Sequence, residues 1–407
     1  MADHRSSTEP TDRESLVKVV IVVDYFFPGH RGGGVPHAVL ELIRRVPTAQ
    51  FDIVTTDKDQ GDPVPYPVDR RWGPAPWGRV HYLTERQQRP FSCWATIRSL
   101  GPDVVLFTST FSRPTVGSLV ARRVKGRNQP VVIWSQGELG PEALAQKRAK
   151  KDVYLRLARM ARLFQGVFWC CADAEELAAA TALSSTGAAE HHPVSVPKPP
   201  KPGPARSKRF GSVCLVYAGR IVERKGLLLL LDALHAVTGD VRVNVIGSPE
   251  DEDYVRACRE RADALPSNCQ VRFLGPLPHD EVMQELSSAD GSVLLSEFES
   301  FGYAVYEALA VGCVPLISAH TAFDFPDGAG GFIVDRDRDA VRAAVQEFVD
   351  MDDDAYRQRS NDCRALAVDL WRNDRHAESL VEHLRAVAVR ATRSTTRTTS
   401  GPTSSSE

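Results

Sequence analysis

The chain lacks the cysteine patterns that mark a disulfide scaffold or a zinc finger. Its 407 residues include 8 cysteines but no Cys-x-x-Cys pair, and several thiols lie in apolar runs such as 168–171. Disulfide frameworks need dense cysteines in a short secreted chain, and structural zinc sites need thiolates at close spacing. The pattern therefore predicts buried free thiols in a reducing cytosol.

Long hydrophobic runs and an excess of one charge are missing as well. Apolar stretches such as Val19–Val23 and Leu227–Leu231 are far shorter than the ~20 residues that span a bilayer, and residues 1–15 contain no apolar export signal. The 50 basic and 52 acidic residues leave a net charge of −2, which argues against a nucleic-acid partner. We expect a cytoplasmic globular enzyme, with enough chain for two or three domains.

Proline and hydroxyl residues mark the divisions of the chain. The stretch 192–209 contains six prolines and favours an extended spacer, because proline interrupts helices and central strands. Residues 391–407 are mostly Ser and Thr and offer little to bury. We predict disordered tails at 1–15 and 391–407, an N-terminal domain at 16–192, a linker at 193–209, a C-terminal domain at 210–370, and a helix at 371–390 that packs back on the N-terminal domain.

Short apolar runs alternate with amphipathic stretches in both halves. The runs are nearly continuous in hydrophobicity, as parallel strands covered on both faces require. Strand–helix alternation predicts an α/β fold of two doubly wound, Rossmann-like domains facing across a cleft. The predicted strands are Val19–Val23, Phe51–Thr55, Val104–Phe107, Val131–Trp134 and Val167–Cys170, then Val213–Tyr217, Val241–Ile246, Val271–Leu274, Ser292–Leu295 and Val314–Ile317.

The loops after the first strand of each half carry candidate anion-binding groups. Gly32, Gly33 and Gly34 precede a helix start and can approach a ligand closely, although a merely flexible connection is an alternative. Neither loop is an intact Gly-x-Gly-x-x-Gly fingerprint, which disfavours an NAD-dependent oxidoreductase. In the second half, Arg220 and Lys225 flank a turn where a diphosphate would lie, unless they are ordinary surface cations.

The most informative segment is 296–315. Glu299 follows a predicted strand, and a helix is expected to begin near Gly302, so the backbone N–H groups of Phe301, Gly302 and Tyr303 would point at an anion. Glu307 lies inside that helix among apolar residues, where a lone carboxylate is costly unless it meets a partner. Two vicinal ribose hydroxyls would supply one. The alternative, that Glu299 and Glu307 are two ordinary surface acids, fits this apolar context poorly.

These residues resemble a known family. Glu299 and Glu307, separated by seven residues and followed by Ala-Leu-Ala-x-Gly-x-x-Pro, are similar to the signature of retaining family 4 glycosyltransferases of the GT-B fold. The turn 219–226 resembles the phosphate-binding turn of that family. Weaker matches lie at 273–275, 289–290 and 328–332.

The resemblance implies transfer of a hexose-type sugar from a UDP- or GDP-sugar to a glycan, lipid-linked or small-molecule acceptor, with retention and without metal or other cofactor. The N-terminal domain would bind the acceptor. Glu307 would bind the ribose, and Glu299 the sugar. The diphosphate would meet Arg220, Lys225 and the amides of Phe301 and Gly302, the Gly32–Gly34 loop would close over it, and the stretch 272–277 with Leu274 and Leu277 would line the base.

The chain departs from the family in one loop. Many members carry His after the fourth strand of the first domain, whereas this chain has Gln136 in Ser-Gln-Gly-Glu-Leu. Glutamine can form hydrogen bonds but cannot offset charge, and we count it among the catalytic residues. A sugar-nucleotide epimerase or hydrolase on the same scaffold, and a non-catalytic nucleotide-sugar-binding protein, are the alternatives to a transferase.

The stretch 143–165 is strongly basic, with seven cations against Asp152. Val153, Leu157, Met160 and Phe164 share one face by helical spacing, with most cations on the opposite arc. Two interpretations stay open. The helix is a peripheral contact with an anionic membrane that carries a lipid-linked acceptor, or it is a solvated outer face.

Overall fold

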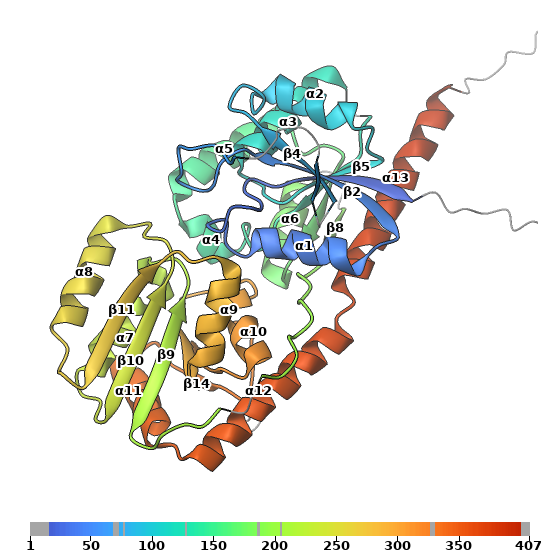
Figure 1. The fold of residues 1–407 in the computed structure, drawn as a ribbon. Coiled ribbons are helices and arrows are strands. Elements are labelled where there is room, and N and C mark those ends of the chain that lie inside the picture. The colour runs from blue at the N-terminus through green and yellow to red at the C-terminus, as the bar shows by residue number, and fades with distance from the viewer. Residues whose placement is uncertain are drawn as a thin grey trace, which may run out of the picture.

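The computed structural model describes residues 16–67, 73–75, 78–126, 128–184, 188–203, 206–325 and 330–399. These residues form two α/β units, each with a twisted, largely parallel sheet between layers of helices (Figure 1). The predicted fold class is confirmed. The predicted tail at 1–15 and the match at Gly328 lie outside the described residues.

The N-terminal unit contains a sheet with the strand order β3-β4-β2-β1-β5-β6-β7-β8, in which only β3 and β4 pair antiparallel. Its strands are β1 (Val17–Val22), β2 (Ala49–Thr56), β3 (Gly73–Ala75), β4 (Gly78–Leu83), β5 (Val104–Phe107), β6 (Val131–Trp134), β7 (Val167–Cys171) and β8 (Ala189–His191). Its helices are α1 (Val35–Arg45), α2 (Pro90–Ser99), α3 (Arg113–Lys125), α4 (Pro141–Ala145), α5 (Arg148–Met160) and α6 (Ala174–Leu183).

The C-terminal unit contains a parallel sheet with the order β11-β10-β9-β12-β13-β14. Its strands are β9 (Ser212–Ala218), β10 (Asp240–Ile246), β11 (Cys269–Gly275), β12 (Gly291–Leu294), β13 (Val314–Ser318) and β14 (Phe332–Val334). Its helices are α7 (Leu227–Leu234), α8 (Glu252–Asp263), α9 (His279–Ser288), α10 (Tyr303–Val311) and α11 (Arg338–Asp350). The strand order reverses beside β1 and β9, and ligands bind at such switch points in doubly wound sheets.

Burial explains why the apolar runs form these strands. Val19 and Val20 are neighbours on β1, point to opposite faces of the sheet, and are both fully buried in separate hydrophobic clusters. A strand covered on both faces gains from every residue, so its sequence is continuously apolar. Each predicted strand is present within two residues at either end.

The last two helices return from the C-terminal unit to the N-terminal one. α12 (Asp353–Asn373) packs on α10, and α13 (His376–Thr399) contributes Ala377, Leu380 and Leu384 to the core of the N-terminal unit (Figure 1). The expected disorder from residue 391 is wrong for the helical backbone up to Thr399. A nucleated helix extends by one hydrogen bond per residue, which offsets the poor helix propensity of Ser and Thr. In the part of the chain that is described, no helix has the length and apolar character needed to span a bilayer.

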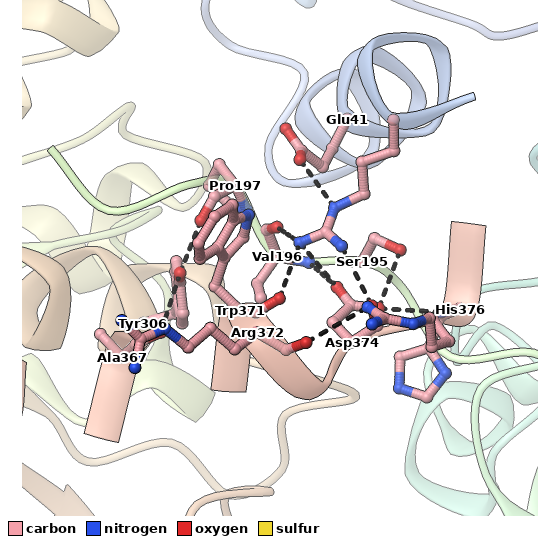
Figure 2. A network of polar contacts seen from close by, with 12 residues as sticks. Glu41, Ser195, Val196, Pro197, Tyr306, Ala367, Trp371, Arg372, Asp374 and His376 are labelled. Atoms are coloured by element: carbon pink, nitrogen blue, oxygen red, sulfur yellow. Dashed lines mark hydrogen bonds and ion pairs between the residues drawn. The ribbon is translucent and has the colours of Figure 1, made fainter. Parts of the chain in front are cut away.

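The chain passes between the units twice, in the linker between β8 and β9 and in the segment between α12 and α13. Polar contacts hold these two crossings together. Asp374, between α12 and α13, accepts hydrogen bonds from Val196 N (2.7 Å) and Ser195 Oγ (3.2 Å) in the linker (Figure 2). From the N-terminal unit, Arg45 Nη2 lies 3.3 Å from Asp374 Oδ2 and donates to Val196 O at 2.6 Å. Tyr306 of α10 donates to Pro197 O at 2.5 Å. Both crossings and both units therefore meet at one buried point.

Candidate active site

A cleft of about 2460 Å³ lies between the two units and receives the loops that follow their strands. Both units line it, so a bound ligand would contact both at once. The predicted site residues that line this cleft are Gly32, Gly33, Gly34, Gln136, Arg220, Lys225, Leu277, Glu299, Phe301, Gly302, Tyr303 and Glu307.

Leu274 is the exception, because it does not line the cleft. It lies on the edge strand β11, where alternate side chains are exposed, and its own side chain is 38% exposed. The chain turns at Gly275, whose φ is +75°, and only then reaches the cleft at Leu277. The structure does not bring Leu274 to the cleft, and its contact with the base stays a prediction.

Lys225 and Glu299 both line the cleft and form an ion pair whose side chains are only 12% and 13% exposed. Lys225 lies in the 3-10 turn Glu223–Lys225, and Gly226 then begins α7 in the left-handed conformation. Ser296 Oγ donates to Glu299 Oε1 at 2.6 Å, so this carboxylate is held from two sides. Burial lowers the pKa of Lys225, and Glu299 opposes that change.

Two arginines accompany Lys225 in the same turn. Arg220 Nη1 donates to both carboxylate oxygens of Glu250, at 2.9 and 3.1 Å. Arg224 was not among the predicted site residues, yet it lines the cleft. Burial, and to a smaller extent Arg220, lower the pKa of Arg224. Three clustered cations make this turn a favourable place for a multiply charged anion.

The start of α10 lies beside this turn, because Lys225 pairs with Glu299, three residues before the helix N-cap. Gly302 is its N-cap in the left-handed conformation, with φ +86°. The first N–H groups of a helix have no partner within the helix, so they favour a negatively charged ligand. The ring of Tyr303 is fixed by its hydroxyl, which donates to Ser195 O at 2.7 Å, and by an edge contact with Phe301.

The partner of Glu307 in this structure is a histidine of the chain. His279 Nε2 lies 2.9 Å from Glu307 Oε1, and this hydrogen bond raises the pKa of His279. The His37 ring lies 4.4 Å from the His279 ring, and burial lowers the pKa of His37 to about 4. The sequence analysis missed both histidines as site residues. The sequence offered one signal for His279, because this residue lies at the start of a helix that follows a predicted strand.

Two loops of the N-terminal unit complete the cleft. In the first, Asp59 Oδ2 accepts the backbone N–H of His30 at 2.9 Å, which holds the glycine loop. A Cβ on Gly34 would lie 2.8 Å from Tyr303 Cδ2, so glycine is needed where the two units approach. Arg31 Nε is buried and has no hydrogen-bond partner among the described residues.

The second loop contains Gln136. Its backbone is left-handed, with φ 49°, and its side-chain Nε2 is buried without a hydrogen-bond partner in the described part of the chain. Nearby, Glu138 accepts from Ser109 Oγ at 2.7 Å and Thr110 N at 2.5 Å. Burial raises the pKa of Glu138 to about 7. The sequence analysis did not single out Glu138, which offers the cleft a further carboxyl group.

Comparison with known proteins relates part of this chain to one family. Residues 206–362 match the family model described as glycosyl transferases group 1. The chain is 29% identical over 170 residues to a glycogen synthase of Mycobacterium tuberculosis (strain CDC 1551 / Oshkosh), covering 39% of this chain and 38% of that one. It is 30% identical over 158 residues to a D-inositol 3-phosphate glycosyltransferase of Corynebacterium diphtheriae, covering 36% of each. The matches thus span well under half of these relatives.

Solved structures resemble the whole fold. Anabaena Alr3699/HepE in complex with UDP and glucose has a TM-score of 0.67 at 14% identity, covering 91% of this chain and 100% of that one. Sucrose-phosphate synthase from Thermosynechococcus elongatus has a TM-score of 0.66 at 17% identity, covering 92% and 100%. At such identities the likeness concerns the fold.

Proposed function

Because residues 206–362 form a glycosyl transferases group 1 domain, we propose that this chain transfers a hexose-type sugar from a UDP- or GDP-sugar to a glycan, lipid-linked or small-molecule acceptor. The observation that carries the proposal is the Lys225–Glu299 pair, which lines the cleft directly beside the N-terminus of α10. A donor needs a site for its anionic diphosphate beside one for its sugar hydroxyls. The complex of Alr3699/HepE with UDP and glucose supports this class of donor.

In the proposed complex the donor takes over contacts that the chain now makes with itself. Its diphosphate lies between Arg220, Lys225 and the first amides of α10. Its sugar hydroxyls meet Glu299, and its ribose meets Glu307. The Gly32–Gly34 loop covers the phosphates from the facing unit, which also binds the acceptor.

Glycosyl transfer passes through an oxocarbenium-like state while the nucleoside diphosphate departs with negative charge. Preorganised cations and helix N–H groups stabilise that charge, because they need no reorganisation during the reaction. We propose that the chemistry proceeds with retention and without a metal. Of the acids at 335–339, Asp337 caps α11 by accepting the N–H groups of Asp339 and Ala340, which supports a structural role for that residue.

Donor turnover with and without acceptor separates the candidate functions. The purified chain is incubated with UDP- and GDP-sugars, and nucleoside diphosphate release is followed with a panel of acceptors. Acceptor-dependent release supports a transferase, and NMR of the new linkage gives its anomeric configuration. Turnover without any acceptor would instead indicate a hydrolase or epimerase, and donor binding without turnover a binding protein.

We further propose a peripheral contact between α5 and the inner face of a membrane. Val153, Leu157 and Met160 are 56%, 58% and 80% exposed, so this apolar face lies open to solvent. Phe164 is an exception to the predicted face, because α5 ends at Met160 and the ring packs in the core. Exposed cations flank the face, and such a helix favours an anionic surface. They are Lys147, Arg148, Lys150, Arg156, Arg159 and Arg162.

Vesicle flotation tests this contact. We expect the chain to float with phosphatidylglycerol vesicles and not with neutral phosphatidylcholine vesicles. L157S/M160S should lose most of the bound fraction. Val64→Ser, which alters an exposed apolar residue far from α5 in the sequence, should keep it. Equal partitioning with both vesicle types would remove the proposal.

A further inference from the structure

A cluster of side chains that could bind a metal ion lies away from the residues that line the cleft. Cys170, His192 and His383 are all buried, and one ligand atom from each lies within 4.8 Å of the others. They come from three parts of the chain, namely β7, the residue after β8, and α13. Because α13 returns along the N-terminal unit, the fold brings together residues more than 190 positions apart (Figure 1).

The hydrogen bonding of this cluster is incomplete. Both ring nitrogens of His192, and Nε2 of His383, are buried and have no hydrogen-bond partner among the residues that the structure describes. The two rings are 5.0 Å apart. A buried imidazole nitrogen without a partner is costly, and a single ligand between the rings could satisfy one nitrogen of each histidine.

One carboxylate borders the cluster. Glu190 Oε2 lies 2.8 Å from His383 Nδ1 and 3.5 Å from His192 Nε2. A histidine that binds a metal through one nitrogen commonly donates its other N–H to a carboxylate, which fixes the ring orientation. His383 has this arrangement, with Nδ1 facing Glu190 and Nε2 left for another partner.

We propose that Cys170 Sγ, a ring nitrogen of His192 and Nε2 of His383 bind a zinc ion, with Glu190 accepting the N–H of His383. One thiolate and two imidazoles are typical zinc ligands, and the mixed soft and borderline set disfavours calcium or magnesium. On binding, the thiol proton of Cys170 leaves to solvent and a Zn–S bond forms. The zinc ion joins α13 to the sheet of the N-terminal unit, and water completes its coordination.

This proposal differs from the sequence-based expectation of free thiols, and the reason is distance along the chain. Paired cysteines at close spacing reveal a zinc finger, whereas here a single thiol meets two histidines from separate elements. The proposal does not depend on the function proposed for the cleft.

Metal analysis of the full-length chain tests the site. After zinc supplementation and desalting, we expect about one zinc per chain by mass spectrometry. Cys170→Ser and His383→Gln should each weaken zinc binding at least tenfold. Cys171→Ser, which alters the next residue on the opposite face of β7, should keep the metal. His279→Gln should keep it as well, because His37, His279 and Glu307 form the other ligand-type cluster.

Cobalt substitution keeps the test decisive if the variants fail to fold. Co²⁺ bound by a thiolate gives a ligand-to-metal charge-transfer band, and the cleft cluster contains no thiol. We therefore expect this band in the wild-type chain, together with a rise in Tm when zinc is added. A folded wild-type chain without the band, or loss of zinc in His279→Gln with retention in Cys170→Ser, would overturn the proposal.

Discussion

At the residue scale, we predict that replacing Lys225 strongly reduces activity. Lys225→Ala removes a cation from the leaving-group site and leaves Glu299 without its ion-pair partner. Loss of one preorganised group of this kind typically costs ~10²–10³ in rate, roughly 3–4 kcal/mol. We expect initial rates of nucleoside diphosphate release to fall by that factor. Arg220→Ala should also be slow.

Lys58→Ala is the matched control, because Lys58 forms a 2.8 Å ion pair with Glu85 on residues that do not line the cleft. Its turnover should stay near wild type. Near-wild-type turnover in Lys225→Ala would remove the assigned role.

We predict that the free energy of unfolding depends on pH through the buried carboxyl group of Glu138. Burial raises its pKa from 4.5 to about 7, so the folded chain holds this proton more tightly than the unfolded chain. The stabilisation that comes from this tighter proton binding is fully present below pH 4.5. It is lost as the pH rises to about 7, which lowers the free energy of unfolding by about 3 kcal/mol in total. Glu138→Gln removes this titration. Urea denaturation at pH 5 and pH 7.5 should show a smaller difference for the variant than for the wild type, and an equal difference would contradict the prediction.

Residues in one local motif could be predicted, whereas partners from distant segments could not. The sequence pattern identified Glu299, Glu307 and the turn with Arg220 and Lys225, and these line one cleft. The pairing of Glu307 with His279 depends on how α9 packs against α10, which no local pattern reveals. The position of Leu274 outside the cleft lining was missed for a related reason, since the direction of a side chain on an edge strand depends on what covers that edge.

At the element scale, the close approach of α1 and α10 predicts an effect of a single methyl group. Gly34 has φ −75°, which alanine adopts without strain, so Gly34→Ala acts through the 2.8 Å approach of its Cβ to Tyr303. Overpacking of this kind typically costs about 1–3 kcal/mol. We expect that loss in urea denaturation.

A double-mutant cycle isolates the cause. In a Tyr303→Leu background the ring is absent, so adding Gly34→Ala should cost much less than it does in the wild type. Equal costs in both backgrounds would mean that the methyl group disturbs something other than the contact between the two units.

Elements with buried faces were easier to predict than edge elements. Strands such as β5 and β6 are buried along their whole length, so hydrophobicity alone marks them. β3, β8 and β14 have three residues each, so the apolar run of β14 is too short to mark a strand, and β8 is largely exposed and has no apolar run. The extension of α13 to Thr399 was missed because composition describes burial and not the hydrogen bonding of a helix that has already formed.

At the scale of the whole molecule, the sequence located the linker but not what holds it. Its prolines predict an extended segment, and the described residues between β8 and β9 form no helix or strand. The contacts of that segment come from Arg45 and Asp374, which lie far from it in the sequence. Their convergence depends on the return of α12 and α13, a property of the assembled fold.

We therefore predict that Asp374 helps to hold the two units against each other. Its carboxylate accepts Val196 N, Ser195 Oγ and His376 N, and pairs with Arg45, while only 5% of the residue is exposed (Figure 2). Asp374→Asn replaces one acceptor oxygen by a donor and leaves Arg45 without a charge partner at this residue. Arg45 keeps its 2.9 Å ion pair with Glu41, so the expected cost is that of unsatisfied buried polar groups, about 1–3 kcal/mol. We expect a lower Tm and, in small-angle scattering, a larger radius of gyration as the units separate.

The control is Asp337→Asn. Asp337 also accepts two backbone N–H groups, but it does so at the start of α11 within one unit, and asparagine caps helices about as well as aspartate. Its Tm and radius of gyration should stay close to the wild type. If Asp374→Asn lowers Tm while the radius of gyration stays unchanged, the cluster stabilises the C-terminal helices alone. The cleft geometry would then depend on the contact of Gly34 with Tyr303 rather than on this junction.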